Sequence, residues 1–277
     1  MSNYVKDKVI IITGTSSGFG KILAGKTADL GAKVVCAARR EDRLKELVSA
    51  IKAKGQEAAY VVTDVTDKAQ VQNMIDFAVK TYGRVDVLVN NSGTMPLAFF
   101  ADHEKALESW ENCIDVNLKG MLYGICAVYD QMMEQGQGHV INLSSIYGNG
   151  PVVGSAVYGL TKYGAGFLAD ALRQETKGRI RVTTIRPTGA ATELSGSVIN
   201  PIAAKGITPN LFEDYMEISK KIAEGKADPD YLDPESIKYF SLHPEYLVDA
   251  IIYSINQPMG VSISDITVRA SGDYLML

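Results

Sequence analysis

A tyrosine and a lysine four residues apart offer acid–base chemistry in the segment Tyr158-Gly-Leu-Thr-Lys162. On a helix, side chains at positions i and i+4 lie on the same face, so Tyr158 and Lys162 can address one point. A phenol has an ordinary pKa of about 10, and a neighbouring cation favours its ionised form. Lowering that pKa by about three units requires roughly 4 kcal/mol, comparable to one unit charge at about 4 Å in a medium of dielectric constant near 20. The pair therefore predicts proton transfer to or from a substrate oxygen.

A pair of serines follows a β-branched run in Ile141-Asn-Leu-Ser144-Ser145. A hydroxyl at the end of a strand can hydrogen-bond a substrate oxygen and hold it near Tyr158, which is a positioning role. No histidine and acid are spaced to make either serine a nucleophile. Asn117 places an amide inside the helical pattern of 115–120, where it belongs either to the same site or to the polar surface.

A glycine-rich segment, Gly14-Thr-Ser16-Ser17-Gly18-Phe19-Gly20, lies between a β-branched run and a helical pattern over 21–30. Glycines at such a turn permit positive φ and the close approach of a pyrophosphate, and the start of the following helix supplies free N–H groups. The spacing G-x-x-x-G-x-G differs from the pattern G-x-G-x-x-G, and the alternative is a tight turn without a ligand. Its place after the first strand of an alternating chain favours a bound nucleotide.

The second β-branched run ends in Ala38-Arg39-Arg40. In an NAD site an acidic residue at about this distance binds the ribose 2′-hydroxyl, whereas a nearby arginine accommodates a 2′-phosphate. Ala38 takes the acidic position here, and a guanidinium can engage phosphate through two hydrogen bonds. The pattern therefore predicts NADP(H); the alternative is that both arginines are solvated residues at the start of the next helix.

The elements that must position these residues are β-branched runs alternating with amphipathic stretches. Strands are predicted over 8–13, 33–38, 57–62, 85–90, 139–143, 179–186 and 261–269, and helices over 43–54, 69–82 and 246–256 among others. The alternation predicts an α/β fold with a doubly wound parallel sheet and helices on both faces. Ligands then gather at the carboxyl ends of the strands.

One segment, 195–244, breaks this alternation. It holds five of the nine prolines, which are Pro201, Pro209, Pro229, Pro234 and Pro244. Proline precludes a long uninterrupted helix or a central strand, while the apolar residues of the segment must pack against something. The segment is therefore either a lid over the site, or an insertion that is decorative or contacts another subunit. We expect a single domain over 1–277 with 195–244 as a substrate-loop insertion.

Composition excludes several classes of protein. With 46% hydrophobic and 22% charged residues, the chain of 277 residues is typical of a globular protein rather than a disordered one. With 28 basic and 32 acidic residues, the chain lacks the excess of positive charge that is typical of a nucleic-acid-binding protein. No apolar run approaches the roughly 18 residues that a membrane-spanning helix requires. The N-terminus lacks the apolar region of a secretory signal, so we expect a cytoplasmic protein. Three scattered cysteines indicate reduced core residues, and three isolated histidines give no metal site.

A set of motifs in this order closely resembles the short-chain dehydrogenase/reductase family over essentially the full chain: Gly14-x-x-x-Gly18-x-Gly20, Asn90-Asn-Ser-Gly93, Asn117, Ser145 and Tyr158-x-x-x-Lys162. The resemblance implies a Rossmann-type domain of seven parallel strands and a nicotinamide cofactor. It also implies that Tyr158 is the catalytic acid and base, while Lys162 lowers its pKa and holds the nicotinamide ribose. Ser145 would orient the substrate carbonyl, and Asn117 would support a water-linked proton relay.

The same resemblance implies a set of cofactor contacts, with Asp64 and Val65 beside adenine and Asn91 beside a ribose. The full set is Gly14, Ser16, Ser17, Gly18, Phe19, Gly20, Arg39, Arg40, Asp64, Val65, Asn91, Gly93, Tyr158, Lys162, Pro187, Thr188, Gly189 and Thr192. Pro187-Thr-Gly189 departs from the usual Pro-Gly of the family. The pair Arg39-Arg40 resembles its NADP-preferring members, and 258–269 resembles a serine-dehydrogenase or carbonyl-reductase branch.

These features predict an NADP(H)-dependent oxidoreductase that interconverts a small-molecule ketone or aldehyde and an alcohol. The expected substrate walls favour a hydrophobic or ring-bearing substrate such as a steroid or aromatic ketone; they are Met95, Leu97, Phe99, Phe100, Tyr147, Val152, Val153 and the segment 195–244. The alternatives are a non-catalytic NADP(H)-sensing or scaffold protein on the same fold, and an epimerase or dehydratase. The family commonly assembles through helices corresponding to about 119–134 and 156–176, which implies a homodimer or homotetramer.

Overall fold

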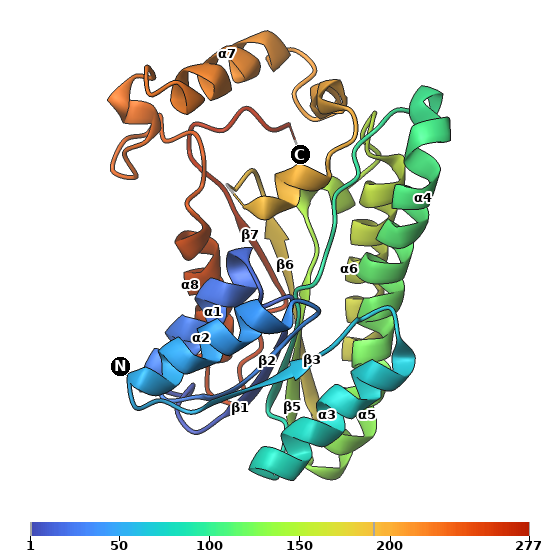
Figure 1. The fold of residues 1–277 in the computed structure, drawn as a ribbon, viewed down its shortest axis with the longest axis vertical. Helices are drawn as coiled ribbons and strands as arrows, with labels where there is room; N and C mark the ends of the chain where they lie inside the picture. The colour runs from blue at the N-terminus through green and yellow to red at the C-terminus, as the bar shows by residue number, and fades with distance from the viewer. Residues whose placement is uncertain (1, 191, 277) are drawn as a thin grey trace.

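Seven parallel strands form one sheet in this computed structural model, which describes residues 2–190 and 192–276. The sheet has the order β3-β2-β1-β4-β5-β6-β7 (Figure 1). The strands are β1 (Val9–Thr13), β2 (Lys33–Ala38), β3 (Ala58–Val62), β4 (Val87–Asn90), β5 (Gly138–Leu143), β6 (Ile180–Pro187) and β7 (Asp265–Val268). The order reverses between β1 and β4, and ligands bind beyond the carboxyl ends of the strands at such a point. The predicted doubly wound, seven-stranded Rossmann-type sheet is confirmed.

Burial explains why these segments are strands. Every residue of β1, β4 and β5 is buried, as expected for a parallel sheet that is covered on both faces. In β1, Ile10 and Ile12 join the hydrophobic cluster on one face of the sheet, and Ile11 joins the cluster on the other face. β7 lies at the edge, where exposed and half-buried residues alternate. It is shorter than the strand predicted over 261–269.

Helices cover both faces of the sheet (Figure 1). The helices α1 (Gly18–Asp29), α2 (Glu41–Ala53) and α8 (Pro244–Ile255) pack on one face. The opposite face is covered by α3 (Lys68–Tyr82), α5 (Gly120–Glu134) and α6 (Ala156–Glu175). A further helix, α4 (His103–Ile114), packs beside α6. Within residues 2–190 and 192–276, no helix is long and apolar enough to cross a membrane.

The three cysteines differ in their surroundings. Cys36 and Cys113 are buried, as predicted, and burial raises the pKa of their thiols to about 12 and about 11. Cys126 is exposed, so the prediction that it is a core residue is wrong. The core side of α5 is formed by residues such as Ile125 and Val128, and Cys126 lies on the opposite side of that helix.

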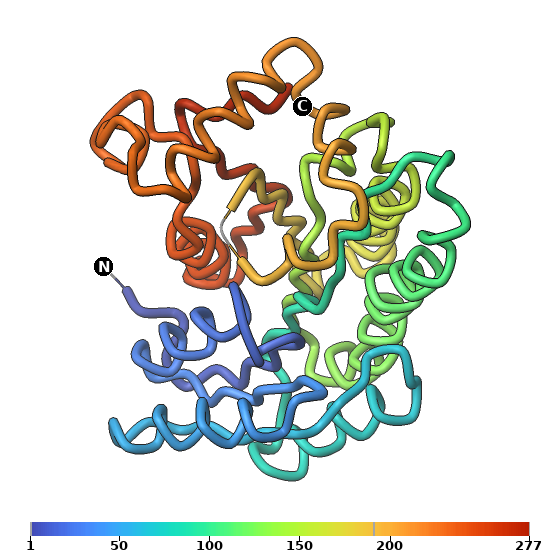
Figure 2. The backbone as a smooth tube through the Cα atoms, turned by 45° about the horizontal axis from the view of Figure 1, so that its top comes forward, coloured from blue at the N-terminus to red at the C-terminus, as the bar shows by residue number. Residues whose placement is uncertain are grey.

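The segment after β6 leaves the sheet and returns to it at α8. It contains α7 (Phe212–Ala223) and the short 3₁₀ helices η4 (Glu193–Ser197), η5 (Pro201–Gly206) and η6 (Pro229–Tyr231). α7 fits into the proline-free stretch between Pro209 and Pro229, which is why a helix of 12 residues forms in this segment. Figure 2 shows α7 and the C-terminal chain side by side. The ring of Phe240, which follows α7, lies between them, with its centroid 5.5 Å from that of Tyr215 on α7 and 5.5 Å from that of Tyr274 in the C-terminal chain. The C-terminal residues thus pack against the segment that contains α7.

Candidate active site

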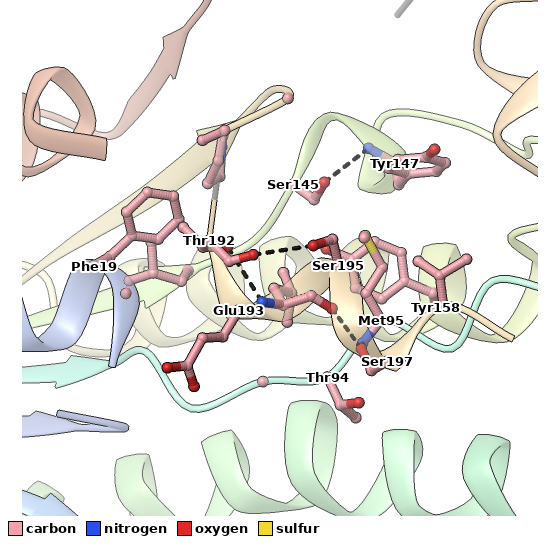
Figure 3. A pocket seen from close by; sticks show the side chains of 18 of the residues that line it. Phe19, Thr94, Met95, Ser145, Tyr147, Tyr158, Thr192, Glu193, Ser195 and Ser197 are labelled. Carbon is pink, nitrogen blue, oxygen red and sulfur yellow. Dashed lines mark hydrogen bonds between the residues drawn. The ribbon is translucent and has the colours of Figure 1, made fainter. Parts of the chain in front are cut away.

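A cavity of about 960 Å³ lies at the carboxyl ends of the strands, and residues of α7 line part of it. Figure 3 shows some of the other side chains that line it. A volume at the upper end of the range for ligand sites suits a large ligand or two ligands together. All of the predicted cofactor residues between Gly14 and Thr192 line this cavity except Gly20. The predicted catalytic residues Ser145, Tyr158 and Lys162 line it as well, whereas Asn117 does not.

The glycine-rich turn between β1 and α1 forms one end of the cavity. Gly14 and Gly18 have φ values of +70° and +53°, which disfavour any residue with a side chain. Ser17 precedes α1 without capping it, and the first turn of α1 contains no acidic residue, so its N–H groups face the cavity without an anionic partner. Gly20 has a different function: a Cβ there would lie 2.6 Å from the carbonyl oxygen of Gly14, so this glycine allows the helix to pack against the turn.

The predicted tyrosine and lysine meet at the other end of the cavity, both on α6. Lys162 Nζ lies 5.8 Å from the centre of the Tyr158 ring and donates a hydrogen bond of 2.8 Å to the carbonyl oxygen of Leu143. The hydroxyl of Ser145, which follows β5, hydrogen-bonds the Tyr158 side chain. Three groups that sequence spacing predicted to act together therefore converge in the structure.

Burial controls the ionisation of this group of residues. Tyr158 and Lys162 are only 3% and 5% exposed. Burial raises the pKa of the Tyr158 phenol above its ordinary value, and the Ser145 hydrogen bond opposes that rise. Burial lowers the pKa of Lys162 to about 8. In the protein alone, burial outweighs the lowering of the Tyr158 pKa that the lysine spacing suggested, and the phenol is held in its protonated form.

Asn117 lies inside the protein, behind the cavity wall. It belongs to a π-helical turn, η2 (Asp115–Lys119), between α4 and α5. Its Nδ2 donates to the carbonyl oxygen of Thr94, and its Oδ1 accepts from the Thr94 N–H, both at 2.9 Å. Nδ2 also contacts Cys113 and Thr161. The alternative that Asn117 is a polar surface residue is wrong, because the π turn rotates its side chain toward the loop after β4.

Some of the predicted substrate walls lie elsewhere. Met95, Leu97 and Tyr147 line the cavity, but Phe99, Phe100, Val152 and Val153 do not. Phe100 and Val153 are 71% and 69% exposed, and Val152 packs in a separate cluster with Ile146 and Ile207. Apolar composition alone could not separate these residues, because the loops after β4 and β5 determine which side chains turn inward.

The missing part of the wall comes from two segments far along the chain. α7 and the residues that follow it supply Tyr215, Met216, Ser219, Ile222 and Phe240, and the C-terminal chain supplies Asp273 and Leu275. The apolar residues of 195–244 provided a signal for the first group. No pattern in the sequence indicated the second group, whose place depends on the course of the chain after β7.

At the glycine-rich end, the two predicted arginines have different partners. Arg39 is 69% exposed in its side chain, and its guanidinium lies 3.9 Å from the carboxylate of Asp64. Arg40 donates from Nε and Nη2 to the hydroxyl of Ser16, at 3.0 and 2.8 Å. Its Nη1 donates to Glu193 at 3.2 Å. Sequence reasoning missed Glu193, which enters the cavity wall from the chain after β6.

Comparison with known proteins gives consistent results. Residues 8–202 match the family model described as short chain dehydrogenase. An uncharacterized oxidoreductase of Staphylococcus saprophyticus is 37% identical over 277 residues, which cover 99% of this chain and 100% of that protein. The closed form of a serine dehydrogenase complexed with NADP⁺ is 29% identical, with a TM-score of 0.74 over 94% of each chain. A variant of actinorhodin polyketide ketoreductase with NADPH is 25% identical, with a TM-score of 0.75 over 96% of this chain and 97% of that one.

Proposed function

This chain belongs to the short-chain dehydrogenase/reductase family, and on that basis we propose that it is an NADP(H)-dependent carbonyl reductase. In the reverse direction it acts as an alcohol dehydrogenase. The observation that carries the proposal is the convergence of the Tyr158 phenol, the Lys162 ammonium and the Ser145 hydroxyl at one end of the cavity. A protein that only binds or senses a nucleotide has no use for a buried phenol beside an ammonium.

The residues of the cavity fit a dinucleotide along its whole length. Gly14 and Gly18 adopt positive φ in the turn before α1, and the N–H groups at the start of that helix have no acidic partner, which suits a pyrophosphate. At the predicted nicotinamide position, the buried Thr188 hydroxyl has no hydrogen-bond partner within the described part of the chain. A buried polar atom without a partner is unusual, and an amide group of the cofactor would satisfy it. When bound, NADP(H) supplies or accepts the hydride.

The side chains of the protein move the proton and hold the substrate. In the direction of reduction, Tyr158 donates its phenolic proton to the carbonyl oxygen, and the Ser145 hydroxyl hydrogen-bonds the same oxygen. Lys162, anchored to the Leu143 carbonyl, places its positive charge beside the phenolate that results. In the direction of oxidation, the phenolate accepts the proton of the alcohol. Asn117 is a positioning residue in this scheme, since it fixes the main chain of Thr94 in the cavity wall.

The preference for NADP(H) is supported by the chemistry at the end of β2. Ala38 leaves no carboxylate to repel a 2′-phosphate, and Arg39 and Arg40 line the cavity beside it. Guanidinium groups bind phosphate through paired, charge-assisted hydrogen bonds. Two of the similar solved proteins are described with NADP⁺ or NADPH.

The substrate that we propose is a hydrophobic or ring-bearing ketone or aldehyde, such as a steroid or aromatic ketone. The wall near Tyr158 contains Met95, Leu97 and Tyr147, and α7 adds Met216 and Ile222. Burial of such a substrate against these side chains contributes about 25 cal/mol for each Å² of apolar surface removed from water.

The proposal extends to the domain organisation and the assembly of the protein. We assign residues 1–277 to one domain, with 195–244 as the segment that closes over the substrate. Exposed apolar side chains on α6, among them Leu160, Tyr163 and Phe167, support assembly through this helix into a homodimer or homotetramer.

A carbonyl panel tests the proposed function. Purified protein is incubated with NADPH and each of a series of aliphatic, aromatic and steroid ketones, and the absorbance of NADPH is followed. We expect oxidation of NADPH with at least one hydrophobic ketone and slower oxidation of NADH. Binding of NADPH without turnover of any substrate would favour a sensing protein. Conversion of a substrate without net NADPH consumption would favour an epimerase or dehydratase.

A further inference from the structure

Glu193 joins two arginines at the start of α2 across the glycine-rich end of the cavity. Its Oε2 accepts a hydrogen bond of 3.2 Å from Arg40 Nη1, and its Oε1 accepts one of 2.8 Å from Arg43 Nη1. Arg40 also donates to the hydroxyls of Ser16 and Ser17 in the glycine-rich turn. The Glu193 carboxylate therefore accepts hydrogen bonds from two guanidinium groups, of which that of Arg40 lines the cavity at the predicted adenosine site.

The chain that carries Glu193 crosses the cavity, and we name residues 192–197 the strap. At one end, the Thr192 side chain lies 3.7 Å from the position that a Cβ on Gly18 would take. At the other end, the Ser197 hydroxyl accepts a hydrogen bond of 2.8 Å from the N–H of Met95 in the predicted substrate wall. Figure 3 shows the strap between these two walls, with the Glu193 carboxylate pointing away from Tyr158. The strap thus links the nucleotide end of the cavity to its catalytic end.

The ion pairs of Glu193 are of a kind in which another anion can replace the carboxylate. The two arginines lower the pKa of Glu193, so its carboxylate is ionised at neutral pH. All three side chains are about half exposed, and exposed ion pairs contribute little to stability. A phosphate group makes the same paired hydrogen bonds to guanidinium as a carboxylate, with more charge. A 2′-phosphate beside Arg40 and the carboxylate of Glu193 would compete for the same donors.

We propose that Glu193 is a specificity-determining residue: an internal carboxylate that competes with the 2′-phosphate of NADP(H) for Arg40 and Arg43 and is displaced when that phosphate binds. This inference rests on the proposed NADP(H) binding. A cofactor without the phosphate leaves Glu193 in place and the strap tethered. Binding of the phosphorylated cofactor frees the strap at its nucleotide end.

Two nucleotide fragments that differ in the 2′-phosphate provide a test that needs no turnover. The dissociation constants of 2′,5′-ADP and 5′-AMP are measured by calorimetry for the wild-type protein and for Glu193→Gln. We expect the variant to bind 2′,5′-ADP about fivefold more tightly, the size expected for loss of an exposed competing charge. Its affinity for 5′-AMP should stay within about twofold. Glu217→Gln is the matched control, since Glu217 is also an exposed carboxylate in an ion pair, on α7 and outside the cavity wall.

Hydrogen exchange provides the second readout. In the wild type, 2′,5′-ADP should accelerate exchange of the strap amides, whereas 5′-AMP should not. In Glu193→Gln the strap amides should exchange quickly even without ligand. Weaker binding of 2′,5′-ADP by Glu193→Gln would overturn the proposal, because Glu193 would then orient the arginines for phosphate. Equal changes for both nucleotides, or the same change in Glu217→Gln, would overturn it as well.

The outcome separates this inference from the proposed function. If the wild type prefers 2′,5′-ADP and Glu193→Gln leaves that preference unchanged, only the role of Glu193 fails. If neither protein distinguishes the two nucleotides, the NADP(H) preference fails, and the role of Glu193 fails with it. If NADPH is oxidised with a ketone in the carbonyl panel, the reductase proposal stands in either case.

Discussion

The two ends of the cavity are built in opposite ways. At the catalytic end, Tyr158 and Lys162 are almost fully buried, and Lys162 is anchored to a main-chain carbonyl of β5. At the nucleotide end, Arg40 and Arg43 are 46% and 45% exposed in their side chains, and both pair with the carboxylate of Glu193. The catalytic end therefore uses buried side chains, and the nucleotide end uses charged side chains that are about half exposed.

This difference in burial matches the different tasks of the two ends, which are proton transfer at the catalytic end and cofactor recognition at the nucleotide end. A buried polar group is expensive to leave without a partner and has a strongly shifted pKa, so its position and protonation are fixed in advance. An exposed ion pair is weak and screened by salt, so its partner can be exchanged for a ligand. We expect substitutions at the buried end to have large effects and substitutions at the exposed end to have small and selective effects.

Removal of the buried ammonium should give the largest loss. In Lys162→Met, we expect turnover at neutral pH to fall by about a hundredfold or more, because no charge remains beside the phenolate. Circular dichroism should show an unchanged fold, since burial of the ammonium is itself unfavourable. Lys45→Met, an exposed lysine of α2, is the control and should retain full activity. A Lys162→Met enzyme with normal turnover would mean that the two ends do not differ as described.

The pH dependence sharpens the same point. Because burial lowers the pKa of Lys162 to about 8, its ammonium is present below that pH and is lost above it. The kcat/KM for reduction should therefore fall as the pH rises through about 8. In Lys162→Arg the guanidinium stays charged, so this decline should disappear even if the rate is lower. A decline that persists in Lys162→Arg would belong to another group.

The same pKa shift has a consequence for stability. The pKa of Lys162 is about 8 in the folded protein, against 10.5 for an unperturbed lysine, so the unfolded chain holds more protons between these values. The contribution of Lys162 to the free energy of unfolding is unfavourable below about pH 8 and becomes less so as the pH rises toward 10.5. Urea titrations of wild type and Lys162→Met should therefore show a difference in the free energy of unfolding that depends on pH in this window. A difference independent of pH would contradict the assignment.

Substitution of Asn117 should have an intermediate effect, which we expect on the free energy of unfolding. In Asn117→Ala the N–H and carbonyl groups of Thr94 lose their partner, and the free energy of unfolding should fall by about 1–3 kcal/mol. Asn73→Ala, at an exposed position of α3, should change it by no more than about 0.5 kcal/mol. Denaturant unfolding of both variants measures the contrast. Equal values would show that the π turn does not depend on this amide.

The exposed ion pair should have the smallest effect. In Arg43→Gln, we expect the free energy of unfolding to change by less than about 1 kcal/mol, because the pair with Glu193 is solvated. Raising the salt concentration should shrink this change further. A loss comparable to that of Asn117→Ala would mean that the pair is a structural anchor rather than an exchangeable contact.

Local patterns in the sequence were sufficient for the features set by short-range geometry. The spacing of Tyr158 and Lys162 was informative because a single helix, α6, fixes their relative direction. The glycine-rich turn was recognisable because Gly14 and Gly18 adopt backbone conformations that other residues disfavour. The sheet followed from apolar runs whose burial on both faces leaves little freedom.

Features that depend on distant segments were not predictable from the sequence. Glu193 lies 153 residues from Arg40 in the chain, and no periodicity connects them. Phe100 and Leu275 have similar apolar character, yet only Leu275 reaches the cavity. Phe100 begins a short 3₁₀ helix, η1 (Phe100–Asp102), and Leu275 lies in C-terminal chain without regular structure, so no periodic pattern indicates the direction of either side chain. The π turn at Asn117 shifts one residue within a continuous helical pattern, and no local signal indicated it.

The role of the Tyr158 phenol is the central claim, and Tyr158→Phe tests it most directly. With a ketone identified in the panel, NADPH oxidation and alcohol formation are measured together for both proteins, and NADPH binding is measured by fluorescence. We predict one NADPH consumed per alcohol formed by the wild type. In Tyr158→Phe we predict a loss of turnover of about a hundredfold or more, with a much smaller change in NADPH affinity because the aromatic ring is kept. Turnover that survives the loss of the phenol would contradict the account.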